Sequence, residues 1–207
     1  MTLDLMKLRT LLLSASVIVA SGAAMAAGFQ WRAESATWTE PAGQSASATV
    51  ESLVTPEYFA IQGLKAWDFD GRICSLQLEQ GSFNAPGSRP LEPFRLCEPK
   101  QTQSWKRADI GSGQFVTAIS VCTAQGKDQG PQLHGVELWG ASIDNNGKLK
   151  PAKAPVRFEF ARCEKWAPKR ACPVGSVATG IRAHSADGQG GALGLALRCH
   201  AISLNSK

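Results

Sequence analysis

Apolar and polar residues alternate along most of this chain, and one alternating segment occurs three times. Each copy reads apolar, apolar, Gln or Thr, Gly or Ala, Leu or Ile, polar, Ala or Val. The copies are Ala60–Ala66 (AIQGLKA), Phe115–Val121 (FVTAISV) and Val177–Ala183 (VATGIRA). A period of two places successive side chains on opposite faces, which is typical of half-buried β-strands. The pattern therefore predicts one strand used three times.

Each copy continues through a polar loop into a second alternating segment. These second segments are Ile73–Leu78 (ICSLQL), Leu133–Leu138 (LHGVEL) and Leu193–Leu197 (LGLAL). The loops between them are rich in Asp and Gly, which accept positive φ angles and close hairpins. We therefore predict three β-hairpins, in units of about 58–80, 113–140 and 175–201.

A further element precedes each hairpin. The motif Phe-x-x-Cys-Glu occurs twice, followed each time by a tryptophan, and a looser version begins near Phe29. The motifs and their tryptophans are Phe94–Glu98 with Trp105, Phe160–Glu164 with Trp166, and Phe29–Glu34 with Trp38. We expect each repeat to hold an outer strand, a tryptophan-bearing connection and then a hairpin. Three such units bury one core by packing their sheets around a common axis.

Helices are not expected, because no window of a dozen residues sustains a period of 3.6. Proline and glycine are frequent, with 11 and 20 residues respectively. Segments 40–56, 81–93 and 143–155 are predicted to be loops or linkers, the first partly disordered. The fold class is thus all-β, in a single three-repeat domain over 27–207.

The first residues are typical of an export signal. Lys7 and Arg9 precede an apolar run at Leu11–Ala20, and Ala24-Met25-Ala26 has the small-x-small pattern of a cleavage site. The run is shorter than the roughly 20 residues that a membrane span needs. We therefore predict a signal peptide over 1–26, a secreted or periplasmic location and no membrane span.

The six cysteines all follow this signal: Cys74, Cys97, Cys122, Cys163, Cys172 and Cys199. An even number in an exported chain predicts disulfides, although six cysteines allow 15 pairings. A metal site is not expected, because Cys-x-x-Cys is absent and the histidines lack ligand spacing. No cofactor is expected either.

The net charge of the chain says little about which molecules it binds. The net charge is +5 and the charged residues are mostly interspersed. This excess permits contact with anionic glycans or lipid head groups but does not indicate it, and a solvated surface is the simpler interpretation. Nucleic acid is not an expected partner.

The third repeat resembles that of the vitelline membrane outer layer protein I family. The resemblance rests on Cys172-Pro173-x-Gly175, on Gly180-Ile181-Arg182 and on Ala192–Cys199 (ALGLALRC). It is best over Ala171–Ala201 and weakest in the first repeat. It implies a β-prism of three Greek-key sheets with pseudo-threefold symmetry, found in secreted coat or matrix proteins that are often discussed as lectin-like.

The same resemblance implies a disulfide between Cys172 and Cys199. Two further pairs would complete the set, Cys122 with Cys163 and Cys74 with Cys97.

Catalytic motifs are absent from the sequence. It contains no Gly-x-Ser-x-Gly, no His-Glu-x-x-His and no glycine-rich phosphate loop. His134 and His200 lie in predicted strands, where a packed core histidine is the simpler interpretation. We therefore expect a protein that is not an enzyme.

The hairpin loops hold the candidate ligand-binding residues. Sugar hydroxyls or a calcium ion could bind their carboxylates, with an indole ring stacking on a sugar. These residues are Trp67, Asp68, Asp70, Asp128, His184 and Asp187. The alternative is that Asp-Gly only makes the turns. The four tryptophans near the outer strands (Trp31, Trp38, Trp105, Trp166) are expected to fill or cap the axis.

A basic segment between Cys163 and Cys172 suggests a different role. Its Lys165, Trp166, Lys169 and Arg170 could insert into a partner protein, or the segment could simply lead into the third repeat. The leading hypothesis is non-catalytic binding of a glycan or another envelope or matrix component. The alternative is an inhibitor or toxin-neutralising protein acting through 163–172, and a glycan-active enzyme using Asp68 and Asp70 comes third.

Overall fold

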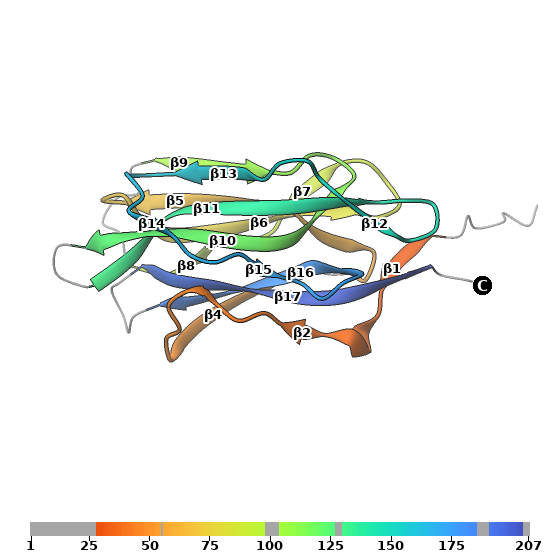
Figure 1. Cartoon of the computed structure of the whole chain (residues 1–207), viewed down its shortest axis with the longest axis horizontal. Helices are drawn as coiled ribbons and strands as arrows, with labels where there is room; N and C mark the ends of the chain where they lie inside the picture. Colours follow the sequence, from red (N-terminus) through yellow and green to blue (C-terminus); the bar gives the residue numbers. More distant parts are fainter. Residues whose placement is uncertain (1–27, 55, 98–103, 127–129, 186–190, 205–207) are drawn as a thin grey trace, which may run out of the picture.

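The computed structural model describes residues 28–54, 56–97, 104–126, 130–185 and 191–204 (Figure 1). The predicted signal peptide lies outside these residues. Within them the fold is all-β, apart from one turn of 3-10 helix, η1 (Ala33–Ser35). In this part of the chain we find no helix with the length and apolar character needed to cross a membrane.

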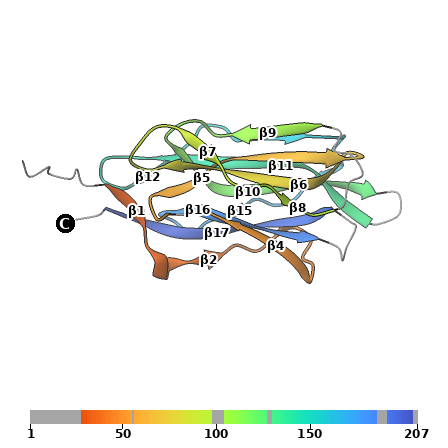
Figure 2. The same cartoon turned by 180° about the vertical axis from the view of Figure 1, so that it is seen from behind.

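Three long antiparallel hairpins form the centre of three sheets. Their strands are β5 (Phe59–Phe69) with β6 (Arg72–Ser82), β10 (Gln114–Gly126) with β11 (Gly130–Ile143), and β16 (Ser176–Ser185) with β17 (Ala192–Leu204). All three lie along the long axis of the molecule in both views (Figures 1 and 2). The predicted all-β fold of three sheets with threefold repetition is confirmed.

Short strands flank each hairpin on both sides. On the first sheet, β6 pairs with β7 (Ser88–Pro90) and β8 (Phe94–Arg95), and β5 pairs with β9 (Trp105–Asp109). On the second, β11 pairs with β12 (Leu149–Pro151) and β13 (Val156–Glu159), and β10 pairs with β14 (Lys165–Trp166) and β15 (Arg170–Ala171). Each chain segment after a hairpin therefore returns to its second strand and then crosses to its first.

The N-terminal strands complete the third sheet. β17 pairs with β1 (Phe29–Trp31), β2 (Thr37–Trp38) and β3 (Ala42–Gly43), and β16 pairs with β4 (Ala48–Leu53). Phe29 lies opposite Leu204, so the two ends of the described chain are neighbours (Figure 2). The third sheet thus closes the prism by joining both ends of the described chain.

Two predictions about these flanking strands were wrong. The outer strand at Phe94 belongs to the hairpin before it, not to the one after it, because Phe94 lies opposite Leu76 of β6. Segments 40–56, 81–93 and 143–155 are not merely loops, since they contain β3 and β4, β7, and β12. Edge strands are commonly short, polar and rich in proline, so their pattern is easily taken for a loop.

A β-bulge occurs at the same repeat position in each first strand. The extra residue is the Gln or Thr of the repeat: Gln62, Thr117 or Thr179. A second register shift follows in each hairpin, with its extra residue on the second strand. Bulges increase local twist, so placing them alike curls the three sheets alike around the axis.

Aliphatic side chains from all three sheets form one core. The residues two positions after the bulge are 0–1% exposed, and they lie opposite a buried leucine: Leu64 opposite Leu78, Ile119 opposite Leu138, and Ile181 opposite Leu197. All six belong to one hydrophobic cluster. The first residues of the three copies, Ala60, Phe115 and Val177, meet in a second, smaller cluster.

The tryptophans do not fill this axis, contrary to the prediction. Trp31, Trp38, Trp105 and Trp166 lie on the flanking strands and none is fully buried. Trp31 packs on the His200 ring, 4.2 Å between centroids, and its indole N–H donates to the Phe59 carbonyl. Flanking strands do contribute to the core, since Ala108 of β9 and Phe158 of β13 belong to the hydrophobic cluster, but these four tryptophans occupy other positions of their strands.

Three disulfides fasten the sheets, and they join the pairs expected above: Cys74–Cys97, Cys122–Cys163 and Cys172–Cys199. The first two tie a central hairpin to the segment that follows it. The third ties Cys172, four residues before the third hairpin begins, to Cys199 of β17. No described cysteine is free.

Candidate functional site

The outer face of the first sheet gathers aromatic and charged side chains. Along β5, Leu64 and Ala66 point into the core, so Lys65 and Trp67 point outwards. Trp67 lies opposite Trp105 on β9, and Lys65 lies opposite Arg107. We call this surface the first-sheet face. Its residues are Lys65, Trp67, Glu79, Arg95, Trp105, Arg107 and Asp109.

The two indole rings of this face hold a lysine between them. The Lys65 Nζ lies 4.2 Å from the Trp105 ring centroid and 4.6 Å from that of Trp67, which is within the range of cation–π attraction. Trp105 is nevertheless 57% exposed. A large aromatic side chain that remains so exposed offers an apolar surface to a ligand.

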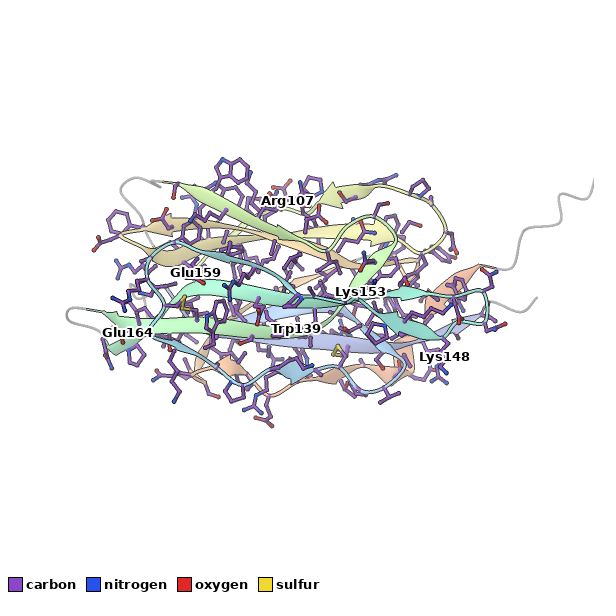
Figure 3. The ribbon with its side chains drawn as sticks, turned by 45° about the horizontal axis from the view of Figure 1, so that its top comes forward. Arg107, Trp139, Lys148, Lys153, Glu159 and Glu164 are labelled. Carbon is purple, nitrogen blue, oxygen red and sulfur yellow. A yellow bond between two sulfur atoms is a disulfide. The ribbon has the colours of Figure 1, made fainter. Side chains whose placement is uncertain are left out.

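Two carboxylates and one guanidinium form an ion-pair network beside the rings. Arg107 forms salt bridges with both Glu79 and Asp109. Burial raises the pKa of Glu79 above its ordinary value, and the adjacent Arg107 opposes that shift. The network occupies the strand positions next to Lys65, and Figure 3 shows Arg107 on the upper strand of the view.

Arg95 adds a further positive charge to this face. It is exposed and lies opposite Ser75 on β6, and Ser75 in turn lies opposite Trp67. Among the described residues, no carboxylate lies within ion-pair distance of Lys65 or Arg95. The face thus holds three cations against two carboxylates, and both carboxylates are paired with the same arginine.

The other two sheets also place cations over tryptophans, but with the rings more covered. On the second sheet, Lys169 lies 5.2 Å from the Trp139 ring centroid. On the third, Arg182 lies 4.1 Å from that of Trp38 and pairs with Glu51 at 2.7 Å. Trp139 and Trp38 are half-buried. Figure 3 shows Arg107 and Trp139 on different sheets, so the two faces are separate surfaces.

The predicted ligand residues of the first hairpin lie on opposite faces of β5. Trp67 belongs to the first-sheet face, whereas Asp68 is buried. The Asp68 carboxylate accepts hydrogen bonds from the Ser104 N–H (2.9 Å), the Ser104 hydroxyl (2.7 Å) and the Gly71 N–H (3.1 Å). Asp70 is exposed at the turn with a φ of 54°. These contacts support the turn interpretation of both aspartates.

The remaining predicted ligand residues do not join that site. Asp128 and Asp187 lie outside the described residues. His184 does not open a loop, since β16 continues to Ser185. The His184 side chain is buried, and its Nδ1 lies 3.1 Å from the Ala46 carbonyl oxygen. Among the described residues, no group of three His, Cys, Asp or Glu could hold a metal ion.

The basic segment between Cys163 and Cys172 is held along the edge of the second sheet. Its strands β14 and β15 pair with β10, and the Ala167 N–H donates to the Val121 carbonyl (2.8 Å). The Ser120 hydroxyl donates to the Ala167 carbonyl (2.7 Å). Lys165 and Lys169 are exposed, whereas Trp166 and Arg170 are half-buried. The segment is thus a connection built into the sheet.

His134 and His200 are both buried, as the sequence suggested. Burial lowers the pKa of His134, while Glu164 and Asp70 act weakly in the other direction. Burial and then Arg198 lower the pKa of His200, against the Ala33 backbone and Glu34. The His200 Nδ1 contacts the Thr179 hydroxyl at 2.5 Å.

These lowered pKa values predict a loss of stability in acid. Below the ordinary pKa of 6.5, the unfolded chain binds protons that buried His134 and His200 do not accept. The free energy of unfolding is therefore highest above pH 6.5 and falls as the pH drops below it. Thermal melts between about pH 7.5 and about pH 5 should show a falling midpoint, with a smaller decrease in His134→Gln. A midpoint independent of pH over this window would contradict the assignment.

Sequence reasoning missed most of the first-sheet face. Trp105, Arg107 and Asp109 alternate along one segment, and Lys65 and Trp67 along another, so each set was readable as one side of a strand. The pairing of β5 with β9 was not readable, since 35 residues separate Phe69 from Trp105 and no motif links them.

Comparison with known proteins shows the fold. No family model matches the chain, and no curated protein matches it. Similar solved structures include Calystegia sepium agglutinin, 13% identical, with a TM-score of 0.53, covering 79% of this chain and 95% of that one. Calsepa lectin in complex with a biantennary N-glycan is 12% identical, with a TM-score of 0.54 and the same coverage. Frutapin, a lectin from Artocarpus incisa, is 10% identical, with a TM-score of 0.51, covering 82% and 99%.

These solved structures share the β-prism architecture. The comparison therefore supports the predicted fold class in addition to the strand topology described above. The narrower resemblance to the vitelline membrane outer layer protein I family is not shown by them. Identities this low establish the fold alone.

Proposed function

We propose that this protein is an exported, non-catalytic glycan-binding protein and that the first-sheet face is its sugar site. The observation that carries the proposal is Trp105, a tryptophan 57% exposed beside a second indole and a row of polar groups. Sugars present apolar C–H faces and hydroxyl rims, which match an exposed aromatic ring surrounded by hydrogen-bonding groups. The lectins that share the fold add support by analogy.

Binding without catalysis is the better interpretation of the carboxylates on this face. Glycoside hydrolysis commonly needs two carboxyl groups that flank the bond to be broken. Here Glu79 and Asp109 are both paired with the single guanidinium of Arg107. Asp68, proposed above as a catalytic group, is buried and fully engaged with the backbone and Ser104. Glu79, Asp109 and Asp68 are therefore not placed for acid–base work on a sugar.

An oxidising location agrees with this role. Three disulfides persist in secreted or periplasmic proteins and are rare in reducing compartments. The protein-partner alternative required Lys165, Trp166, Lys169 and Arg170 to project from a loop that inserts into a partner. Their segment is instead hydrogen-bonded along β10, which does not support insertion. Nucleic acid remains outside the expected partners.

The test compares glycan binding by the mature protein with that of Trp105→Ala. A glycan array should give signal for a defined class of sugars, and Trp105→Ala should weaken binding about five- to tenfold, because an aromatic contact contributes about 1 kcal/mol. Trp139→Ala is the matched control, since Trp139 also lies under a lysine but is half-buried on another sheet. A flat array, or equal losses in the two variants, would argue against this site.

A further inference from the structure

We infer that the sugar bound on the first-sheet face is acidic, and that Lys65, assisted by Arg95, binds its carboxylate or sulfate group. This inference rests on the proposed glycan-binding function and adds the chemical class of the ligand. It follows from how the charges of the face are distributed.

Lys65 is the cation best placed to meet a ligand stacked on Trp105. Its ammonium nitrogen lies 4.2 Å from that ring's centroid, so a sugar on the exposed indole brings its substituents close to Lys65. Contact with two π faces attracts the ammonium but does not neutralise its charge. Among the described residues no carboxylate lies within ion-pair distance of Lys65, although Glu79 interacts with its charge from farther away. The ammonium group therefore has no direct ion-pair partner and can form one with an external anion.

The carboxylates of the face do not oppose such an anion strongly. Both Glu79 and Asp109 are bound by Arg107, which confines their negative charge to one side of Lys65. Counting Lys65, Arg95 and Arg107 against these two carboxylates leaves a net charge of 3 − 2 = +1. The whole chain is also positive, at +5, which favours the approach of anions.

On the third sheet, the cation that lies over a tryptophan is already paired with a carboxylate of the same sheet. There Arg182 lies over Trp38, as Lys65 lies over Trp105, but Glu51 pairs with Arg182 at 2.7 Å. Arg182 and Lys65 occupy the same position of the repeat. The first sheet therefore differs from the third because no carboxylate forms a direct ion pair with this cation and because its tryptophan is exposed.

Arg95 extends the cationic surface to the other side of Trp67. It lies on β8, two strands across from Trp67 of β5, which corresponds to about 9–10 Å at the usual strand spacing. Lys65 lies two residues further along β5, so the backbones of the two cations are roughly 12 Å apart. An oligosaccharide stacked on the indoles would thus have a cation on each side of Trp67. Repeating acidic sugars, which carry a charge on alternate units, fit this spacing of positive groups.

The experiment uses three hexasaccharides and calorimetry with the mature, disulfide-bonded protein. Hyaluronan hexasaccharide carries carboxylates only, chondroitin sulfate hexasaccharide carries carboxylates and sulfates, and the chitin hexasaccharide is neutral. We expect at least one acidic oligosaccharide to bind tenfold or more tightly than the neutral one, with an affinity that falls as salt is raised. Binding of hyaluronan assigns carboxylate recognition, and binding of chondroitin sulfate alone assigns sulfate recognition.

Variants locate the effect on Lys65. Lys65→Gln should lower the affinity for the acidic sugar about tenfold more than it lowers the affinity for the neutral sugar, whereas Lys65→Arg should retain the preference. Lys169→Gln is the matched control, because Lys169 lies over half-buried Trp139. Equal loss in Lys65→Gln and Lys169→Gln would overturn the inference.

The failures of the two proposals are distinguishable. Neutral binding as tight as acidic binding, still dependent on Trp105, would overturn the acidic-sugar inference and leave the glycan site standing. Binding of none of the three hexasaccharides also overturns the inference. The glycan array then decides the proposed function separately, since it includes neutral sugars of other classes.

Discussion

Complete reduction of the three disulfides is expected to lower the free energy of unfolding by roughly 6–12 kcal/mol, at about 2–4 kcal/mol for each bridge. The bridges close segments of 23, 41 and 27 residues, and in the reduced chain these segments gain conformational freedom. Folded domains are stable by about 5–15 kcal/mol in total, so the reduced protein should be largely unfolded at moderate temperature. Urea titrations of the oxidised protein and of the reduced, alkylated protein measure the difference.

Removing a single disulfide provides a control for complete reduction. The double variant Cys172→Ser with Cys199→Ser should lose only about a third of the total, about 2–4 kcal/mol. It leaves the bridges of the first two sheets intact. A reduced protein that unfolds at the same urea concentration as the oxidised one would refute a structural role for these cysteines.

Truncation at the shared core should have the second largest effect. Leu64→Ala, Ile119→Ala and Ile181→Ala should each cost about 2–5 kcal/mol of unfolding free energy, since each removes a fully buried aliphatic side chain from one cluster. The three costs should be similar, because the residues occupy the same position of the repeat. Chemical denaturation of the three variants provides the measurement.

The control for this series is Leu53→Ala, since Leu53 is 37% exposed on β4 and its truncation should cost under about 1 kcal/mol. Widely unequal costs among the three core variants would contradict a single core shared evenly around the axis. A three-state denaturation curve in the wild-type protein would contradict it as well, because one core predicts one cooperative transition.

The first-sheet face shows how the prism architecture makes room for a site. In the prism, the inward-facing side chains of the three central hairpins form the core and stabilise the fold. The outward-facing positions are therefore free to vary between repeats. Position 65 is lysine in the first copy and serine or arginine at Ser120 and Arg182. The same backbone thus presents an open aromatic face on one sheet and covered ones on the other two.

The hairpins were predictable because their information is local. Alternation over Ala60–Ala66 and Ile73–Leu78, joined by an Asp-Gly turn, specifies two strands and the turn between them without reference to the rest of the chain. The two bulges that shift their register were not predicted. Because the segment is repeated, the same prediction of a hairpin applied to the other two copies. The role of Asp68 in the turn was predicted in the same way, since its Gly71 contact spans three residues.

The flanking strands and the binding face were not predictable, because they depend on contacts between distant segments. β4 reaches β16 across more than a hundred residues, and its polar, exposed positions gave no periodic signal strong enough to distinguish it from a loop. Trp105 was expected at the axis because tryptophan is large and apolar. Its strand lies at the border of the first sheet, where one side meets solvent.

The sequence by itself determined the three hairpins, the turn of the first one and the all-β class, since alternation and turn chemistry act between near neighbours. The tertiary structure decided which strand each flanking segment joins, and hence that Trp67 and Trp105 enclose Lys65 on an outer face. The physical reason is that backbone hydrogen bonding at a sheet edge accepts almost any short segment. The choice of partner is made only when three sheets close together around one core.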